Sequence, residues 1–258
     1  MNVLDISPLQ LALCLIFVLI AGTGSVVLRL GLERDLAWGT VRTFAQLFLM
    51  GYVLKYLFQL SSLWVILALF AFMVFWAAYT IRSRLTEKSV PIFLPTYLSM
   101  LISYTLVTIL VTSVIVQVKP WYAPQYFIPL GGMIVGNSMN AITISLERLF
   151  AELRSRREEI ELGLCLGASY QEATQQIFRS TVRAGMIPSI NALMTVGLVS
   201  IPGMMTGQIL AGSDPVVAIK YQIVVMLMIA AATAIGAVGL VYLVRRRCFT
   251  SAHQLVIR

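Results

Sequence analysis

Long apolar runs separated by short polar connections dominate the pattern of this chain. Seven runs reach the roughly 20 residues that a helix needs to cross the hydrocarbon core of a bilayer. They cover residues 8–28, 38–58, 63–81, 95–116, 125–146, 187–210 and 217–244. The pattern therefore predicts an all-α polytopic membrane protein with about seven transmembrane helices, which form one transmembrane domain over residues 1–258.

The composition agrees with this interpretation. Apolar residues occupy 59% of the 258 positions and charged residues only 12%, whereas a soluble domain has about 45–50% and about 25%. Three scattered cysteines are too few for a disulfide scaffold. We therefore expect a multi-pass protein of the cell membrane, embedded in the lipid bilayer, and of the inner membrane if its source is bacterial.

The basic residues predict how the spans are oriented. Of the 19 Lys and Arg residues, 16 lie in alternate connections and in the tail, and only Lys55, Lys119 and Lys220 lie on the other side. By the positive-inside rule, the N-terminus is outside and the C-terminus is inside the cell. The net charge of +8 then reflects orientation. Because no basic face is interleaved with aromatic residues, we expect no nucleic-acid partner.

One connection, on the expected cytoplasmic side, is much longer than the others. This connection lies between the fifth and sixth spans, in a polar region that covers residues 147–186. Leu149, Leu153 and Ile160 recur near the period of a helix, which predicts that the fifth span continues as a helix beyond the membrane.

This long helix is expected to end at Gly167. Ser169 and Glu172 have the spacing of a capping box, which predicts a second helix running towards residues 185–188. The two helices are either simply solvated or form a docking surface. Apolar residues at the bend, such as Leu166, favour docking, because an exposed apolar tip usually contacts a partner.

The residues needed for catalysis inside a membrane are missing. The single histidine, His253, lies in the tail, so the sequence has no zinc-binding H-E-x-x-H helix. No carboxylate lies well inside a span, whereas ion-coupled carriers usually have one. No glycine is followed by lysine, which excludes a P-loop. We expect a non-catalytic chain that binds no cofactor and takes any energy for transport from another chain.

The fifth and sixth spans contain residues that weaken or break a helix. The fifth carries Pro129 and three glycines, and the sixth carries Pro202 and Gly203. Backbone groups freed in this way bond to neighbours or line a cavity. We therefore expect a substrate pathway along these two spans, formed by Met133, Asn137, Met139, Pro202, Gly203, Met204 and Met205.

The chemistry of this pathway leaves alternatives open. Methionine thioethers suit soft metal ions such as Cu(I), but methionine is also a common flexible residue that fills gaps in a core. Asn137 either hydrogen-bonds to another helix or contacts substrate. The sequence therefore assigns no metal ligands.

Several ungapped motifs stand in one order along the chain. They are residues 132–139 (GMIVGNSM), 195–207 (TVGLVSIPGMMTG), 209–215 (ILAGSDP) and 218–222 (AIKYQ). Together they closely resemble the FetB family of ABC-transporter permeases. That family includes a bacterial iron exporter subunit and plant aluminium-tolerance permeases.

The resemblance implies a permease subunit of an ABC transporter, arranged as a homodimer. Separate ATPase subunits would hold ATP and Mg²⁺. The cytoplasmic bend would be the coupling helix that docks on the ATPase, with Glu159, Glu161, Leu166, Gly167 and Ala168 as its candidate residues.

A general signature of ABC permeases, E-A-A-x-x-x-G with a later Ile, is partly matched in this region. Glu161, Gly167 and Ile177 stand at the matching offsets, whereas Leu162 and Gly163 replace the two alanines. The resemblance also implies export of iron or of a related metal species. The alternative is a seven-span receptor or scaffold that recruits a cytoplasmic signalling partner, although a scaffold has no need of the two broken spans.

Overall fold

The computed structural model describes residues 6–59, 62–250 and 254–257. All regular elements in these ranges are helices, accompanied by two isolated β-bridges. The chain divides into two compact units. The first comprises Met1–Ser61 with Leu210–Gly212, and the second comprises Ser62–Ile209 with Ser213–Arg258.

The first unit is a helical hairpin. It contains α1 (Pro8–Leu13), α2 (Leu15–Val27) and α3 (Glu33–Leu57). The buried side chain of Ser25 closes the turn between α2 and α3. Its Oγ donates to Glu33 Oε2 at 3.1 Å and accepts the N–H of Leu32 at 2.9 Å.

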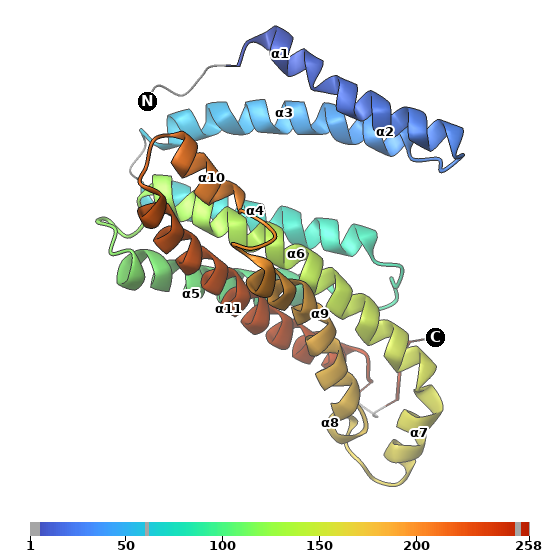
Figure 1. Ribbon diagram of the computed structural model, residues 1–258. Helices are drawn as coiled ribbons and strands as arrows, with labels where there is room; N and C mark the ends of the chain where they lie inside the picture. The colour runs from blue at the N-terminus through green and yellow to red at the C-terminus, as the bar shows by residue number, and fades with distance from the viewer. Residues whose placement is uncertain (1–5, 60–61, 251–253, 258) are drawn as a thin grey trace. The chain divides into compact units, whose positions relative to one another are not determined.

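The second unit is a bundle of long helices. They are α4 (Leu63–Arg84), α5 (Phe93–Leu110), α6 (Pro124–Ser155), α9 (Gln175–Thr195) and α11 (Pro215–Arg247). The last turn of α5 widens into a short π-helix, η1 (Val111–Ile115). Figure 1 shows α5, α6 and α11 packed side by side, which makes these helices the centre of the bundle.

Small polar residues hold the centre of this bundle together. The hydroxyl groups of Ser138 on α6 and Thr233 on α11 are 2.8 Å apart and completely buried. Ser99 on α5 donates to the carbonyl of Gly236 on α11 at 3.1 Å. Away from water, such bonds satisfy groups that would otherwise destabilise the bundle. Gly236 allows α5 to approach closely, since a Cβ at this position would lie 3.1 Å from the ring of Tyr104.

Shorter helices cover one end of the bundle and one of its sides. They are α7 (Arg157–Cys165), α8 (Tyr170–Ala173) and α10 (Gly203–Leu210). The predicted break at Gly167 is confirmed, since this residue has φ +93° and lies between α7 and α8. The two helices predicted on either side of it are not continuous, because Arg156 separates α6 from α7 and Thr174 separates α8 from α9. The predicted capping box is also present. Ser169 accepts from the backbone of Glu172, and the Glu172 carboxylate accepts the N–H of Ser169 at 2.8 Å.

Two details of the fifth and sixth spans differ from the prediction. The fifth span is not broken, because α6 runs continuously through Pro129. The sixth span is not one helix. Instead, α9 passes through Gly185 and Pro188, ends at Thr195, and is followed by a turn over 196–202 before α10 begins at Gly203. A glycine with φ +84°, Gly197, stands in that turn, so the break begins earlier than Pro202.

Five segments of the described chain are long and apolar enough to cross a membrane. They are Pro8–Val27, Leu63–Arg84, Phe93–Ile115, Pro124–Ser155 and Pro215–Arg247. The expected span at 38–58 is helical within α3, but Arg42, Gln46 and Lys55 lower its mean hydropathy. The number of seven spans and their orientation therefore stay predictions.

Candidate functional site

A helical hairpin extends from one end of α6 and returns into α9 (Figure 1). It comprises α7, α8 and the first turns of α9, and we call residues 156–181 the hairpin. Buried side chains fill its interior, including Ile160, Thr174 and Ile177, each at most 1% exposed. The hairpin is therefore an ordered, packed extension of the bundle.

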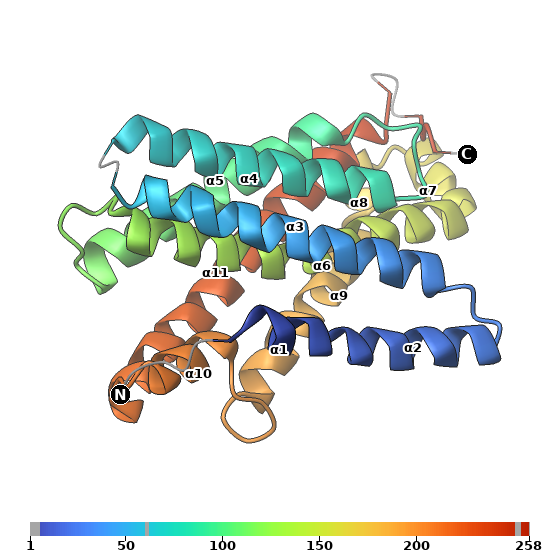
Figure 2. The same ribbon diagram turned by 90° about the horizontal axis from the view of Figure 1, so that it is seen from above.

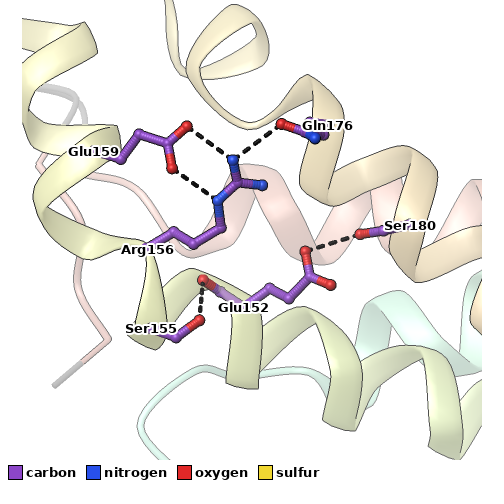
Figure 3. A network of polar contacts seen from close by, with 6 residues as sticks. All are labelled: Glu152, Ser155, Arg156, Glu159, Gln176 and Ser180. Atoms are coloured by element: carbon purple, nitrogen blue, oxygen red, sulfur yellow. Dashed lines mark hydrogen bonds and ion pairs between the residues drawn. The ribbon is translucent and has the colours of Figure 1, made fainter.

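A polar network fixes the base of the hairpin, as Figure 3 shows. Arg156, between α6 and α7, donates from Nε and Nη2 to the two carboxylate oxygens of Glu159, both at 2.8 Å. Its Nη2 also donates to Gln176 Oε1 on α9 at 2.9 Å. Glu152 on α6 accepts from Ser180 on α9 at 2.8 Å. The two contacts join the arms of the hairpin at their base.

The network stabilises the protonated, positively charged form of Arg156. The hydrogen bond to Glu159 raises the pKa of the Arg156 guanidinium, with smaller contributions from the charges of Glu159 and Glu152. A forked guanidinium that binds a carboxylate through two parallel bonds fixes direction as well as distance. The network therefore sets the angle at which α7 leaves α6.

The tip of the hairpin is apolar and exposed. Leu162 is 61% exposed and Leu166 is 81% exposed. Gly167 completes the turn with a backbone conformation that suits glycine. A Cβ on Gly163 would meet the Cβ of Ala173 at 3.6 Å, so α7 and α8 run close together here. The structure therefore presents apolar side chains on a rigid turn.

Of the predicted coupling residues, Leu166, Gly167 and Ala168 form this tip, whereas Glu159 and Glu161 lie on α7, between the base and the tip. Glu159 and Glu161 are exposed and form ion pairs with Arg156 and Arg157, at 2.8 Å and 2.7 Å. Ala168 is half-buried. The prediction missed Arg156, which was visible in the sequence only as one member of a run of charges.

The substrate pathway was predicted along the fifth and sixth spans, and a cavity of about 290 Å³ lies there between α6, α10 and α11. In Figure 2, α10 lies near the N-terminal end of α11, and residues of both helices line this cavity. We call it the α6–α10–α11 cavity. It is lined by Gln125, Tyr126, Pro129, Leu130, Met133, Met204, Gln208, Ser213, Val217 and Tyr221.

The polar groups of the α6–α10–α11 cavity carry no charge. They are amides, hydroxyl groups and phenols, together with two thioethers. Gln208 Oε1 is buried without a hydrogen-bond partner among the described residues. Pro129 has no N–H to offer the carbonyl of Gln125, so this oxygen is also free of its usual helical partner. The cavity therefore holds oxygen acceptors available to a ligand.

The predicted pathway residues are divided between two places. Met133 and Met204 both line the α6–α10–α11 cavity, although they are far apart in sequence. Pro202 and Met205 line a second cavity of about 360 Å³, between the end of α9, the turn over 196–202 and α11. Gly203 begins α10 beside both.

Neither Asn137 nor Met139 is among the described residues that line these two cavities. The side chain of Asn137 is exposed and donates to the carbonyl of Met133 at 2.8 Å, within its own helix. The prediction missed Gln125, Gln208 and Tyr221, because no sequence motif places α10 against α6 and α11.

The described residues contain no group of three or more His, Cys, Asp and Glu side chains that could hold a metal ion. His253, the only histidine, lies outside the described residues. The oxygen and thioether groups that line the α6–α10–α11 cavity are uncharged candidate donors for a metal ion.

Comparison with known proteins identifies the family. The model of UPF0014, described as an uncharacterised protein family, matches residues 8–249. The chain belongs to the UPF0014 family. Among its relatives is the probable iron export permease protein FetB of Escherichia coli, which is 35% identical over 258 residues, covering 100% of this chain and 98% of FetB. The resemblance to the FetB permeases is confirmed.

Other UPF0014 relatives span a wide range of organisms. A UPF0014 membrane protein of Synechocystis is 39% identical over 228 residues, or 88% of each chain. The protein ALUMINUM SENSITIVE 3 of Arabidopsis thaliana is 35% identical over 245 residues, covering 95% of this chain and 88% of that protein. No solved structure matches the chain.

These relatives agree with the apolar helices, and the chain is a multi-pass membrane protein. The names of the Synechocystis and E. coli relatives denote a membrane protein and a permease and not an enzyme, in agreement with the expectation of a non-catalytic chain.

Proposed function

We propose that this chain is the membrane-spanning permease subunit of an ABC transporter that exports iron or a related metal species. In the proposed complex, two copies of the chain pair with two separate ATPase subunits, which bind and hydrolyse ATP. The permease and iron-export parts of this assignment extend to the chain what the name of its E. coli relative states. The absence of a P-loop from the sequence is consistent with an ATP site on another chain.

The observation that carries the proposal is the apolar tip of the hairpin. Leu162 and Leu166 are largely exposed at the end of an ordered element, where solvent alone would favour polar residues. The network around Arg156 holds this tip at a fixed angle to α6 and α9. A rigid apolar tip suits insertion into a groove of a partner protein.

Movement of the docked hairpin would reach the bundle through its own continuous helices. The hairpin joins α6 without a loop of more than one residue, and α9 carries its other arm into the bundle. When ATP binding draws the ATPase subunits together, displacement of the hairpin would tilt α6 and α9 and open or close the α6–α10–α11 cavity. The turn over 196–202 gives α9 and α10 freedom to move separately.

The α6–α10–α11 cavity supports transport of a metal in complexed form. Bare iron ions prefer charged oxygen ligands or nitrogen ligands, and the cavity offers uncharged oxygens and thioethers. Its volume of about 290 Å³ is close to the lower end of the range known for small-molecule sites, about 300–1,000 Å³. We therefore infer that iron crosses with part of its ligand shell still attached.

A pull-down of the tagged full-length chain from its native membrane, in a mild detergent, tests the proposal. We expect it to capture an ATPase with a P-loop. The variants Leu166→Glu and Gly167→Pro should lose this partner, since one places a charge on the tip and the other cannot adopt φ +93°. Gln175→Glu adds the same charge at another exposed position of the hairpin and should retain the partner.

Capture of a different cytoplasmic protein instead of an ATPase would favour the receptor or scaffold class. Capture of the ATPase by Leu166→Glu as strongly as by the wild-type chain would show that the tip is not the docking surface. Transport that continues after the ATP site of the partner is destroyed would exclude the proposed mechanism.

A further inference from the structure

An arginine is buried where α11 meets the hairpin. Arg245 lies in the last turn of α11 and is only 4% exposed. Its guanidinium carbon is 4.7 Å from the ring centre of Phe178 on α9, and 6.0 Å from the ring centres of Tyr170 on α8 and Tyr242 on α11. Two of the three rings therefore belong to the hairpin.

Aromatic rings take the place of an acidic partner at this site. Within the described part of the chain, no ion pair includes Arg245, and its Nε and Nη1 have no hydrogen-bond partner. A buried charge without compensation strongly destabilises a fold. The negative faces of aromatic rings attract a guanidinium most strongly when water is excluded, which is the situation here.

The neighbouring arginines behave differently. Arg246 and Arg247 are exposed, and Arg247 donates to the carbonyl of Pro91 at 3.1 Å. Three adjacent arginines at the end of a membrane helix would ordinarily be assigned to orientation alone. Because only Arg245 is enclosed by the hairpin, its role differs from that of the other two.

The C-terminal segment strengthens the same junction. The rings of Tyr170 and Phe249 are 5.4 Å apart, and Phe249 is buried. Arg157 on α7 donates to the carbonyl of Ile257 at 3.4 Å, and Ile257 is 1% exposed. The hairpin is thus tied to α11 and to the segment that follows it, in addition to α6 and α9.

We propose that Arg245 is a positioning residue that ties α11 to the hairpin, so that displacement of the hairpin also moves α11. The other end of α11 lines the α6–α10–α11 cavity through Val217 and Tyr221. Between these ends α11 is one uninterrupted helix of 33 residues, which transmits movement along its axis. The coupling role rests on the proposed ABC permease function, whereas the tie between α11 and the hairpin does not.

Hydrogen–deuterium exchange of the full-length chain in lipid nanodiscs tests the tie by itself. In Arg245→Met, which keeps an unbranched, flexible side chain but removes the guanidinium and its charge, amides of residues 170–181 should exchange about tenfold faster. Phe178→Leu should act in the same direction. Arg245→Lys retains a cation for the rings and should restore most of the protection, while the matched control Arg246→Met should resemble the wild-type chain.

Exchange of residues 170–181 at the wild-type rate in Arg245→Met, or equal acceleration in Arg246→Met, would overturn the tie.

A second experiment uses the complex of the chain with its ATPase. Arg245→Met should bind the ATPase normally and lose the stimulation of ATP hydrolysis that the wild-type chain gives its ATPase, and unchanged stimulation would overturn the coupling role. If the wild-type chain captures no ATPase, the proposed function fails and the coupling role fails with it, while the exchange experiment still decides the tie.

Discussion

Gly185 brings α9 against α6 at a distance that no other residue permits. A Cβ at this position would collide with the hydroxyl of Ser145 and would lie 2.9 Å from the carbonyl oxygen of Ala141. Both of these neighbours belong to α6 and are buried. The absence of a side chain at residue 185 thus sets the spacing of two helices that we expect to move with the hairpin.

Gly185→Ala should therefore destabilise the protein, by about 1–3 kcal/mol, which is typical of overpacking. The measurement is the thermal unfolding midpoint of the purified chain in detergent. Gly136→Ala on α6 is the matched control, because nothing lies within 4 Å of the added Cβ. Alanine favours a helix over glycine by up to about 1 kcal/mol, so this variant should be unchanged or more stable. An equal loss of stability in both variants would contradict the packing argument.

Two cysteines differ sharply in their surroundings. Cys165, the last residue of α7, is exposed, and Cys248 is completely buried. Burial raises the pKa of the Cys248 thiol to about 12, with a further contribution from the charge of Glu87. Since the thiolate is the reactive form, Cys248 is protonated and unreactive at neutral pH.

In a Cys14→Ser background, a maleimide should modify Cys165 more than about a hundredfold faster than Cys248 at pH 7.5. Mass spectrometry of the labelled chain measures this ratio. With a membrane-impermeant maleimide, Cys165 should react in inside-out vesicles and not in right-side-out vesicles, which also tests the predicted orientation. Rapid labelling of the folded double variant Cys14→Ser/Cys165→Ser would show that Cys248 is accessible, which would contradict the prediction.

Among the elements, the start of the second arm of the hairpin depends on a cap. The hydroxyl and N–H of Ser169 donate to the Glu172 carboxylate at 2.7 Å and 2.8 Å. These hydrogen bonds lower the pKa of Glu172 below its ordinary value of 4.5. A carboxylate with a lowered pKa stabilises the folded state above its unfolded pKa, and this stabilisation is lost as the pH falls through the folded pKa.

We therefore expect protection of the amides of residues 169–175 to be constant at neutral pH and to fall at a pH below 4.5, after correction for intrinsic exchange rates. Hydrogen–deuterium exchange at several pH values measures this. Glu172→Gln should remove most of the pH dependence of these amides. Glu158→Gln on α7 should leave it in place, and the same response in both variants would contradict the role of the cap.

The cap shows which parts of an element can be predicted from sequence. Ser169, Glu172 and Gly167 act through backbone groups within a few residues, and the predicted capping box and helix break are confirmed. Pro188 was expected to begin a span and instead lies inside α9, since a helix in a bundle tolerates a proline whose freed carbonyl is satisfied elsewhere. Gly131, one of the three glycines expected to weaken α6, instead leaves space for the ring of Phe70 on α4, which a Cβ at residue 131 would meet. Tertiary packing decides both cases.

The candidate site was predictable to a similar degree. The exposed tip follows from apolar residues beside a turn, which is a local pattern, and Leu166 is indeed exposed. The α6–α10–α11 cavity depends on where α10 folds back, so the prediction contained Met133 and Met204 but not Gln125 or Gln208. The environment of Arg245 was equally hidden, because three consecutive arginines look alike in sequence.

For the whole molecule, the interruption between α9 and α10 is the feature that we expect a transporter to need and a passive scaffold to lack. Replacing Pro202 and Gly203 by Ala and Leu should favour a longer helix and restrict the turn over 196–202. We expect this double variant to bind the ATPase normally and to lose transport, measured as metal efflux from loaded vesicles. Undiminished efflux would show that the turn has no part in transport.

The length of α6 has a mechanical consequence. Its 32 residues extend for about 48 Å, whereas the hydrocarbon core is only about 30 Å thick. The rings of Trp121 and Tyr122, 5.5 Å apart just before α6, are suited to the headgroup level and would anchor that end of the helix. The excess length then projects as a lever arm at the opposite end. A partner pushing on it would apply torque to the bundle without touching the lipid.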